Sequence, residues 1–129
     1  MPVSTKYNEL LDVVEATWTG TITKQELTDA TEEHLGFHTH KGVQKFLNDF
    51  SSVERLSLSM ADLYELPNKK YEESNASRMA QIALIKPSIS EVSELIEFYV
   101  TACMNRGWSA RVFKEYNEAI EWLGHKQNT

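Results

Sequence analysis

The chain has 129 residues, of which 41% are apolar and 25% are charged, and its formal net charge is −6. This length and composition fit one domain with its own hydrophobic core and exclude a chain that is disordered throughout. The acidic charge argues against nucleic-acid binding, because that class of protein needs a basic surface.

The N-terminal part of the sequence predicts a β-hairpin. Residues 11–19 are rich in β-branched and aromatic side chains, which is typical of a strand. Residues 3–7 are expected to pair with this strand as a shorter one, across a turn near Asn8 and Glu9. Gly20 is the expected end of the second strand.

A helix and a strand are expected next. Thr23 and Glu26 have the spacing of a capping box, which starts a helix. Five side chains recur on one side of this helix at helical spacing, namely Leu27, Ala30, Thr31, His34 and Leu35. Gly36 is the predicted end of the helix, with one further turn as the alternative. Residues 43–49 predict the strand that follows.

The middle of the chain predicts a short helix followed by a loop. Ser59 and Asp62 are placed to cap a helix that runs to Leu66. Pro67 is expected to end this helix, because the residue before a proline avoids the α conformation. Residues 67–77 are polar and lack apolar periodicity, so we expect an exposed loop there.

The remaining elements alternate between strands and helices. The apolar run over residues 79–85 predicts a central strand that is covered on both faces. A long helix capped by Ser88 or Ser90 is expected to reach Arg106, with Gly107 as its stop. A strand over residues 109–113 and a helix over residues 117–123 complete the pattern.

The element order β-β-α-β-α-β-α-β-α predicts an α/β fold. Alternation of this kind favours a mixed, mainly parallel sheet with right-handed crossovers. The fold is therefore expected to combine this sheet with an N-terminal antiparallel hairpin and about four helices. We expect residues 1–124 to form a single domain and residues 125–129 to form a free tail.

Three stretches of the sequence stand out together, namely residues 18–26 (WTGTITKQE), residues 78–85 (RMAQIALI) and residues 111–123 (RVFKEYNEAIEWL). With them, the chain resembles the SpoIIAA-like group of the STAS superfamily. Their order and spacing are similar to the family's pattern over nearly the whole chain, and most of their residues are structural. The resemblance therefore implies the STAS fold and leaves the activity open.

The resemblance implies two kinds of function, of which the first is regulation through protein partners. Family members that act as anti-sigma-factor antagonists carry a serine that a partner kinase phosphorylates, and Ser59 falls near that position. Ser57 and Met60 stand where the family has an aspartate and a glycine, so the motif is degenerate. The alternative role for Ser59 is that of a helix N-cap.

The second kind of function follows from the family's resemblance to CRAL-TRIO lipid-exchange domains, which implies a small apolar or lipid-like ligand and transient membrane contact. Four apolar side chains crowd the short helix, namely Leu58, Met60, Leu63 and Leu66. We expect this helix to be a loosely held cover over a pocket or a membrane contact. Lys69 and Lys70 are expected to meet anionic head groups. In the alternative interpretation the leucines fill the core and the lysines are solvated.

Other reactive side chains favour structural roles. His34 and His38 have the spacing of two metal ligands on a helix, but no Cys or Asp completes the set, so no metal site is predicted. Cys103 is expected to be a small buried residue without nucleophilic activity. Phe98 lies at the polar edge of its helix, which indicates either a subunit contact, as in a homodimer, or a pocket wall.

No motif in the sequence indicates catalysis. The chain has neither a glycine-rich phosphate loop nor a nucleophile elbow, and its carboxylates have the positions of solvated residues. We therefore expect a non-catalytic binding domain without a cofactor. The single cysteine, the lack of a signal segment and the lack of an apolar run of ~20 residues predict a cytoplasmic protein, peripheral to the inner face of the membrane where it meets one.

Overall fold

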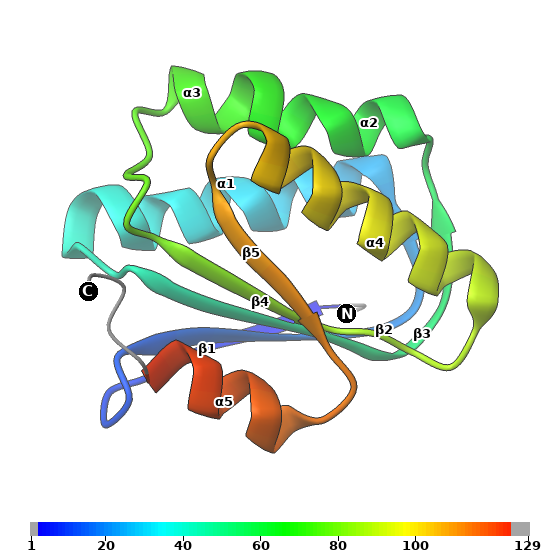
Figure 1. The fold of residues 1–129 in the computed structure, drawn as a ribbon, viewed down its shortest axis with the longest axis horizontal. Coiled ribbons are helices and arrows are strands. Elements are labelled where there is room, and N and C mark those ends of the chain that lie inside the picture. The colour runs from blue at the N-terminus through cyan, green and yellow to red at the C-terminus, as the bar shows by residue number, and fades with distance from the viewer. Residues whose placement is uncertain (1–2, 125–129) are drawn as a thin grey trace.

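The computed structural model describes residues 3–124, and a five-stranded sheet runs through it (Figure 1). The order of the strands in the sheet is their order in the chain. The strands are β1 (Val3–Asn8), β2 (Val13–Thr23), β3 (Lys45–Ser57), β4 (Gln81–Ile85) and β5 (Ser109–Phe113). β1 pairs with β2 in the antiparallel sense and all other pairs are parallel. This confirms the predicted mixed, mainly parallel sheet with an N-terminal hairpin.

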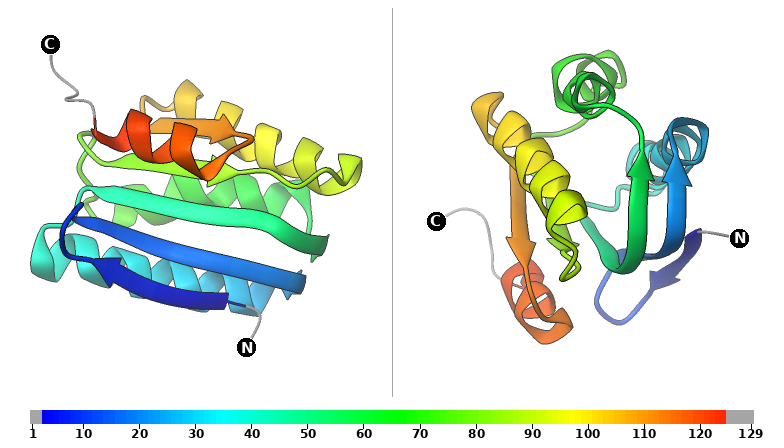
Figure 2. Two further views of the ribbon diagram at one scale, coloured as in Figure 1. Left: turned by 90° about the horizontal axis from the view of Figure 1, so that it is seen from below. Right: turned by 90° about the vertical axis from the view of Figure 1, so that its right-hand side faces the viewer.

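Helices cover both faces of the sheet unequally (Figure 2). They are α1 (Lys24–Lys41), α2 (Met60–Glu65), the π-helical turn η1 (Leu66–Lys70), α3 (Tyr71–Glu73), α4 (Ser90–Asn105) and α5 (Tyr116–Gly124). α5 lies alone on one face, and the other helices share the opposite face. On the face opposite α5, which is the more crowded one, the helices therefore pack against each other as well as against the sheet.

The two faces carry separate hydrophobic cores. Under α5, a small core joins Leu123 and Ala119 to strand residues such as Leu47. On the opposite face, a larger core joins strand residues such as Trp18 to α4 residues such as Ile96. The period-2 alternation of β2 assigns its side chains to the two faces in turn.

The structure corrects the expected end of β2 at Gly20. This residue has a φ of +71°, which glycine adopts without steric cost, and the register between β2 and β3 shifts around it. The extra residues at these register shifts lie in β3, and Gly20 does not break β2. Pairing continues to Thr23 and Ser57, well beyond the Asp49–Ile85 pair at which β3 and β4 separate.

The structure also corrects the expected end of the first helix at Gly36. α1 continues through this residue to Lys41 and ends at Gly42, which has a φ of +70° and donates its backbone N–H to the carbonyl oxygen of His38. A glycine inside a helix costs only about 1 kcal/mol relative to alanine, so the left-handed Gly42 is the effective stop.

Most of the other predicted boundaries are confirmed. The capping boxes at Thr23 and Ser59 are both present, and Gly107 follows α4 with a φ of +80°. β3 is longer than the predicted strand, because its second half pairs with the extension of β2. The tail predicted for residues 125–129 lies outside the described residues.

Candidate functional site

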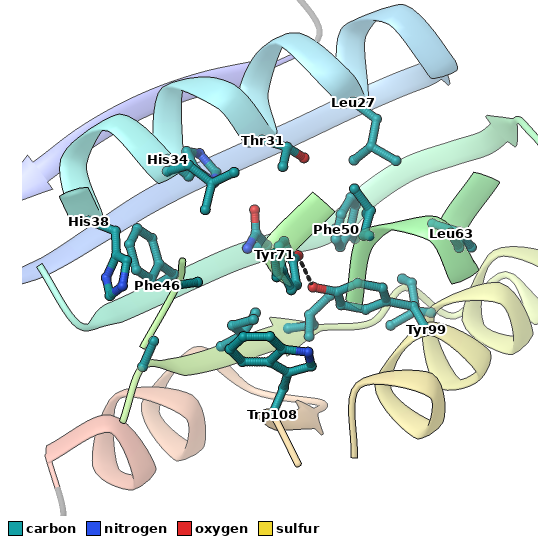
Figure 3. Close-up of a pocket in the computed structure, with 18 of the residues that line it drawn as sticks. Leu27, Thr31, His34, His38, Phe46, Phe50, Leu63, Tyr71, Tyr99 and Trp108 are labelled. Carbon is teal, nitrogen blue, oxygen red and sulfur yellow. Dashed lines mark hydrogen bonds between the residues drawn. The ribbon is translucent and has the colours of Figure 1, made fainter. Parts of the chain in front are cut away.

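A cavity of about 100 Å³ lies between the sheet and the helices that cover its more crowded face (Figure 3). Most of its lining side chains are apolar, and among residues 3–124 none of them is Asp, Glu, Lys or Arg. They are Trp18, Leu27, Thr31, His34, Leu35, His38, Phe46, Asn48, Phe50, Leu56, Leu63, Leu66, Tyr71, Ala76, Ser77, Ala80, Ile82, Leu84, Ile96, Tyr99 and Trp108. An apolar cavity with a few polar groups is the usual form of a small-molecule site.

One side of the cavity is a stripe along α1. Leu27, Thr31, His34 and His38 lie on successive turns of this helix and face the cavity (Figure 3). Steps of three and four residues keep side chains on one helix face. The capping box fixes where the helix begins, because the Thr23 hydroxyl accepts from the Glu26 amide at 3.2 Å. The inward side of α1 predicted from the sequence is confirmed by this lining.

The opposite side is a continuous helical run over residues 60–73, which we call the cover segment. It consists of α2, η1 and α3, and it contains Pro67. The Tyr71 amide donates to the carbonyl oxygen of Leu66, five residues earlier, which is the wider bonding pattern of a π-helix. This wider turn accommodates the proline ring and its missing N–H.

The cover segment corrects two predictions. Pro67 does not end the helical run, and the first half of the expected exposed loop over residues 67–77 is helical. Pro67 is buried and Tyr71 lines the cavity, so this stretch belongs to the interior as much as to the surface. The polar sequence concealed this, because most of the other side chains between Pro67 and Ser77 are polar.

Trp108 anchors the cover segment to the rest of the fold. Its indole Nε1 donates to the carbonyl oxygen of Pro67 at 2.9 Å, and its ring meets the edge of the Tyr71 ring at a centroid distance of 5.6 Å. The guanidinium of Arg78 lies 3.4 Å from the centroid of the same indole and forms an ion pair with Glu72. Trp108 therefore contacts the cover segment in two ways, through the hydrogen bond of its Nε1 and through the packing of its ring on Tyr71.

Two tyrosines, the buried Tyr99 and the partly buried Tyr71, close the cavity between the cover segment and α4. The hydroxyl oxygens of Tyr71 and Tyr99 lie 2.5 Å apart and form a hydrogen bond (Figure 3). Burial raises the pKa of both phenols above their ordinary value of 10. Both side chains are therefore neutral at physiological pH, and each satisfies the other's polar group.

Two histidines of α1 have different environments in the cavity. Both ring nitrogens of His38 are bonded, because Nδ1 donates to the Val43 carbonyl at 2.7 Å and Nε2 accepts from the Ser77 amide at 3.0 Å. His34 stacks on Phe46 at a centroid distance of 6.0 Å, and its Nε2 is buried without a partner among residues 3–124. Burial lowers the pKa of His34 to about 4, so its imidazole is neutral.

The cover segment meets α1 mainly through exposed ion pairs. Lys70 lies 3.0 Å from Glu32, and Lys24 lies 3.2 Å from Asp62. Pairs of this kind contribute little to stability, typically about 0–1 kcal/mol, because water screens them. The contact with α1 is therefore weaker than the buried contact with Trp108.

The residues that the sequence singled out for a ligand or a membrane fall on different sides of the cover segment. Leu63 and Leu66 line the cavity, and Leu58 packs against the neighbouring core. Met60 is 51% exposed on the outer side, and Lys69 is also exposed. Lys70 is bound to Glu32. The structure thus brings together the inner leucines and separates them from Met60 and the lysines.

Ser59 is the N-cap of α2, as one of the two interpretations predicted. Its hydroxyl accepts from the Asp62 amide at 3.2 Å, and its own amide donates to the Asp62 carboxylate at 2.9 Å. Phosphorylation of Ser59 stays a prediction. A phosphate at this position would lie beside the Asp62 carboxylate, and two negative groups this close repel each other.

The other candidate side chains occupy structural positions. Cys103 is fully buried, and burial raises the pKa of its thiol to about 12. Phe98 is partly buried against the larger core and is absent from the cavity lining. Within the part of the chain that the structure describes, no three His, Cys, Asp or Glu side chains are grouped as metal ligands.

Three aromatic residues that shape the site were not predicted from the sequence. Tyr71 falls within the expected loop over residues 67–77, and neither Tyr99 nor Trp108 was singled out as a candidate. One signal was available, since Leu63, Pro67 and Tyr71 recur every four residues and so continue an inward helix face through the proline. The partners of Tyr99 and Trp108 lie about 30 and 40 residues away, and spacing alone does not reveal them.

The chain is a mixed α/β protein. Its five-stranded sheet follows the chain order, and α1, the cover segment and α4 cover one face of it. The model of the family described as SpoIIAA-like matches residues 13–124. The chain belongs to the SpoIIAA-like family. No helix within residues 3–124 is long and apolar enough to cross a bilayer.

A search of curated proteins gives no match to the chain. Among solved structures, the chain is similar to an uncharacterized protein from Shewanella loihica PV-4 with a SpoIIAA-like fold. The TM-score is 0.54 and the sequence identity is 20%, over 94% of this chain and 91% of that chain. At this identity the similarity shows the fold alone.

Proposed function

We propose that this protein is a non-catalytic binding domain for a small apolar ligand. The observation that carries the proposal is the cavity between α1, the cover segment and the sheet, to whose lining the described part of the chain contributes no Asp, Glu, Lys or Arg. Burial of an apolar molecule there removes its surface from water at no cost in buried charge. The cover segment is the element that encloses the ligand.

The volume of the cavity favours a ligand no larger than a single ring. An engineered apolar cavity of about 150 Å³ binds benzene, and the cavity here has about 100 Å³. A lipid-like ligand with a long chain fits only after the cover segment moves away from α1. The small-ligand form of the proposal is therefore the one that the present structure supports best.

The ionisable groups in the cavity favour binding over catalysis. A general acid or base works best when its pKa lies near the operating pH. Burial shifts the pKa of His34 down to about 4 and the pKa values of Tyr71 and Tyr99 up, so all three are held in their neutral forms. His38 is occupied by two backbone groups. Groups held in their neutral forms suit a binding site.

The weak contact between α1 and the cover segment supplies a route to the cavity. A surface groove runs between these two elements and shares Leu27, Thr31 and Leu66 with the cavity lining. The ion pairs across it are exposed and can exchange with water. Buried contacts hold the other side at Trp108, so opening is expected on the side of α1.

Titration with toluene, followed by amide chemical shifts, tests the proposal. We expect saturable shifts at residues around the cavity in the wild-type protein. Ala76→Leu fills space in the cavity and is expected to abolish them, whereas Ala61→Leu adds the same atoms on the exposed side of α2 and is expected to leave them unchanged. Shifts that do not saturate, or that survive Ala76→Leu, would contradict the proposal.

A second candidate function, transient membrane contact, rests on the outer side of α2. Met60 and Tyr64 are 51% and 53% exposed there. Residues 59–73 hold four acidic and two basic side chains, so apolar insertion and not attraction to anionic lipid would carry the contact. Co-sedimentation with phosphatidylcholine vesicles that is lost in a Met60→Asp, Tyr64→Asp variant supports it, and equal sedimentation of both proteins contradicts it.

A further inference from the structure

One polar atom in the cavity differs from the rest. Nε2 of His34 is buried and has no hydrogen-bond partner among residues 3–124. Several other polar groups of the lining are engaged, since Tyr71 bonds Tyr99, Trp108 bonds Pro67 and both nitrogens of His38 are occupied. A buried polar atom without a partner costs free energy, and native proteins rarely leave one without a reason.

We propose that Nε2 of His34 is the hydrogen-bonding anchor for the ligand, which therefore carries one uncharged hydroxyl group on a small apolar body. This inference rests on the proposed function, because it names the ligand class that the same cavity takes. The apolar lining holds the body of the ligand, and the histidine holds its single polar group.

The position of His34 suits this role. The imidazole stacks on Phe46 with an angle of 27° between the ring planes, which fixes its orientation on the α1 stripe (Figure 3). Neighbouring positions on the stripe, Thr31 and Leu35, also line the cavity. A ligand between the stripe and Tyr71 therefore has His34 at its edge and apolar rings around it.

The chemistry of the lining excludes a charged ligand group. The lining residues that the structure describes include no Lys or Arg to neutralise an anion and no Asp or Glu to neutralise a cation. Burial keeps the imidazole itself neutral, so it offers one nitrogen that donates and one that accepts. A hydroxyl both donates and accepts, and it therefore pairs with Nε2 in either tautomer.

Phenol and toluene are the probes that test the inference, because they differ by a hydroxyl in place of a methyl group. The quantity to measure is the ratio of their dissociation constants in the wild-type protein and in His34→Leu, by chemical-shift titration. Loss of one hydrogen bond to a buried group is expected to weaken phenol relative to toluene by about ten-fold in His34→Leu. A change of cavity volume alters the binding of toluene as well as that of phenol. The ratio of the two dissociation constants therefore reports the contribution of the phenol hydroxyl group alone.

Two further measurements keep the result specific. Tyr71→Phe removes a different hydroxyl of the lining and is expected to leave the ratio within about two-fold of wild type. The imidazole ¹⁵N resonances of His34 are expected to shift with phenol and to stay unchanged with toluene. His34→Phe is the second variant if His34→Leu does not fold, and it is expected to lose the phenol preference equally.

The outcomes separate this inference from the proposed function. If toluene binds and the ratio is the same in wild type and in both His34 variants, the cavity binds ligands but His34 is not the anchor. A ratio that changes in Tyr71→Phe alone, or benzoate binding tighter than phenol at pH 7, also overturns the inference. If neither toluene nor phenol binds the wild-type protein, the proposed function itself fails.

Discussion

The indole Nε1 of Trp108 and the carbonyl oxygen of Pro67 form a buried hydrogen bond of 2.9 Å. This bond joins the residue just before β5 to the proline in the middle of the cover segment. It satisfies a backbone oxygen at the point where the helical pattern widens into a π-helix, and such freed groups need a partner when buried. The cover segment is therefore firmly attached on this side.

Replacing Trp108 with Phe is expected to lower the free energy of unfolding by about 1–3 kcal/mol, because the Pro67 carbonyl loses its partner. Urea unfolding measures the change. Trp122→Phe removes the same atoms from a ring that packs on Phe113 on the other side of the sheet, and it is expected to cost less. An equal loss of unfolding free energy in the two variants would show that the hydrogen bond to Pro67 does not add to the stability of the fold.

The pKa of His34 predicts how stability depends on pH. The folded-state pKa of about 4 lies below the ordinary value of 6.5, so the unfolded chain binds more protons between these values. The free energy of unfolding is therefore expected to fall as the pH drops from about 6.5 to about 4, with a total contribution from this group of about 3 kcal/mol.

Urea unfolding of wild type and His34→Leu over this pH range tests the prediction. The difference in the free energy of unfolding between the two proteins cancels the contributions of all other groups. We expect the variant to become more stable relative to wild type as the pH falls. Parallel stability profiles for the two proteins would mean that His34 titrates normally in the folded state.

The capping box of Ser59 predicts a local loss of stability on truncation. Ser59→Ala removes the hydroxyl that accepts from the Asp62 amide and is expected to cost about 1 kcal/mol. Amide exchange of residues 60–64 is expected to become faster, because these residues form the first turns of the cover segment. Ser57→Ala, at the exposed end of β3, is the matched control, and faster exchange in both variants would count against the cap.

Burial of Cys103 predicts an unreactive thiol. Its pKa is raised to about 12, and the thiolate is the form that attacks disulfide reagents. An aromatic disulfide reagent at pH 8 is expected to modify the folded protein only at the rate of unfolding, and to modify it at once in denaturant. Rapid modification of the folded protein would show that α4 exposes this side chain.

The fold could be predicted because its signals are local. The capping boxes, the left-handed Gly107 and the alternation of strands and helices each depend on residues a few positions apart. Gly20 and Gly36 were misjudged because a glycine can end an element or lie within it. For Gly20, pairing of β2 with the distant β3 decides between these outcomes, and for Gly36 the left-handed Gly42 supplies the stop.

The site could be predicted only in part. Leu63 and Leu66 were identified from the apolar character of the short helix, and the inward side of α1 from its periodicity. The rule that a proline ends a helix concealed Tyr71, since the rule ignores a π-turn that tertiary contacts stabilise. The separation of Met60 and Lys70 from the leucines depends on which side of the cover segment faces the sheet, and that needs the whole fold.

The central claim is that the space beneath the cover segment accepts an apolar guest. A crystal of the protein under xenon pressure tests this directly, because xenon enters dry apolar cavities and gives strong scattering. We predict a xenon peak between Thr31, Leu66 and Tyr71 in the wild-type protein and no peak there in Ala76→Leu. Wild-type crystals that bind xenon only elsewhere, or not at all, would contradict the account.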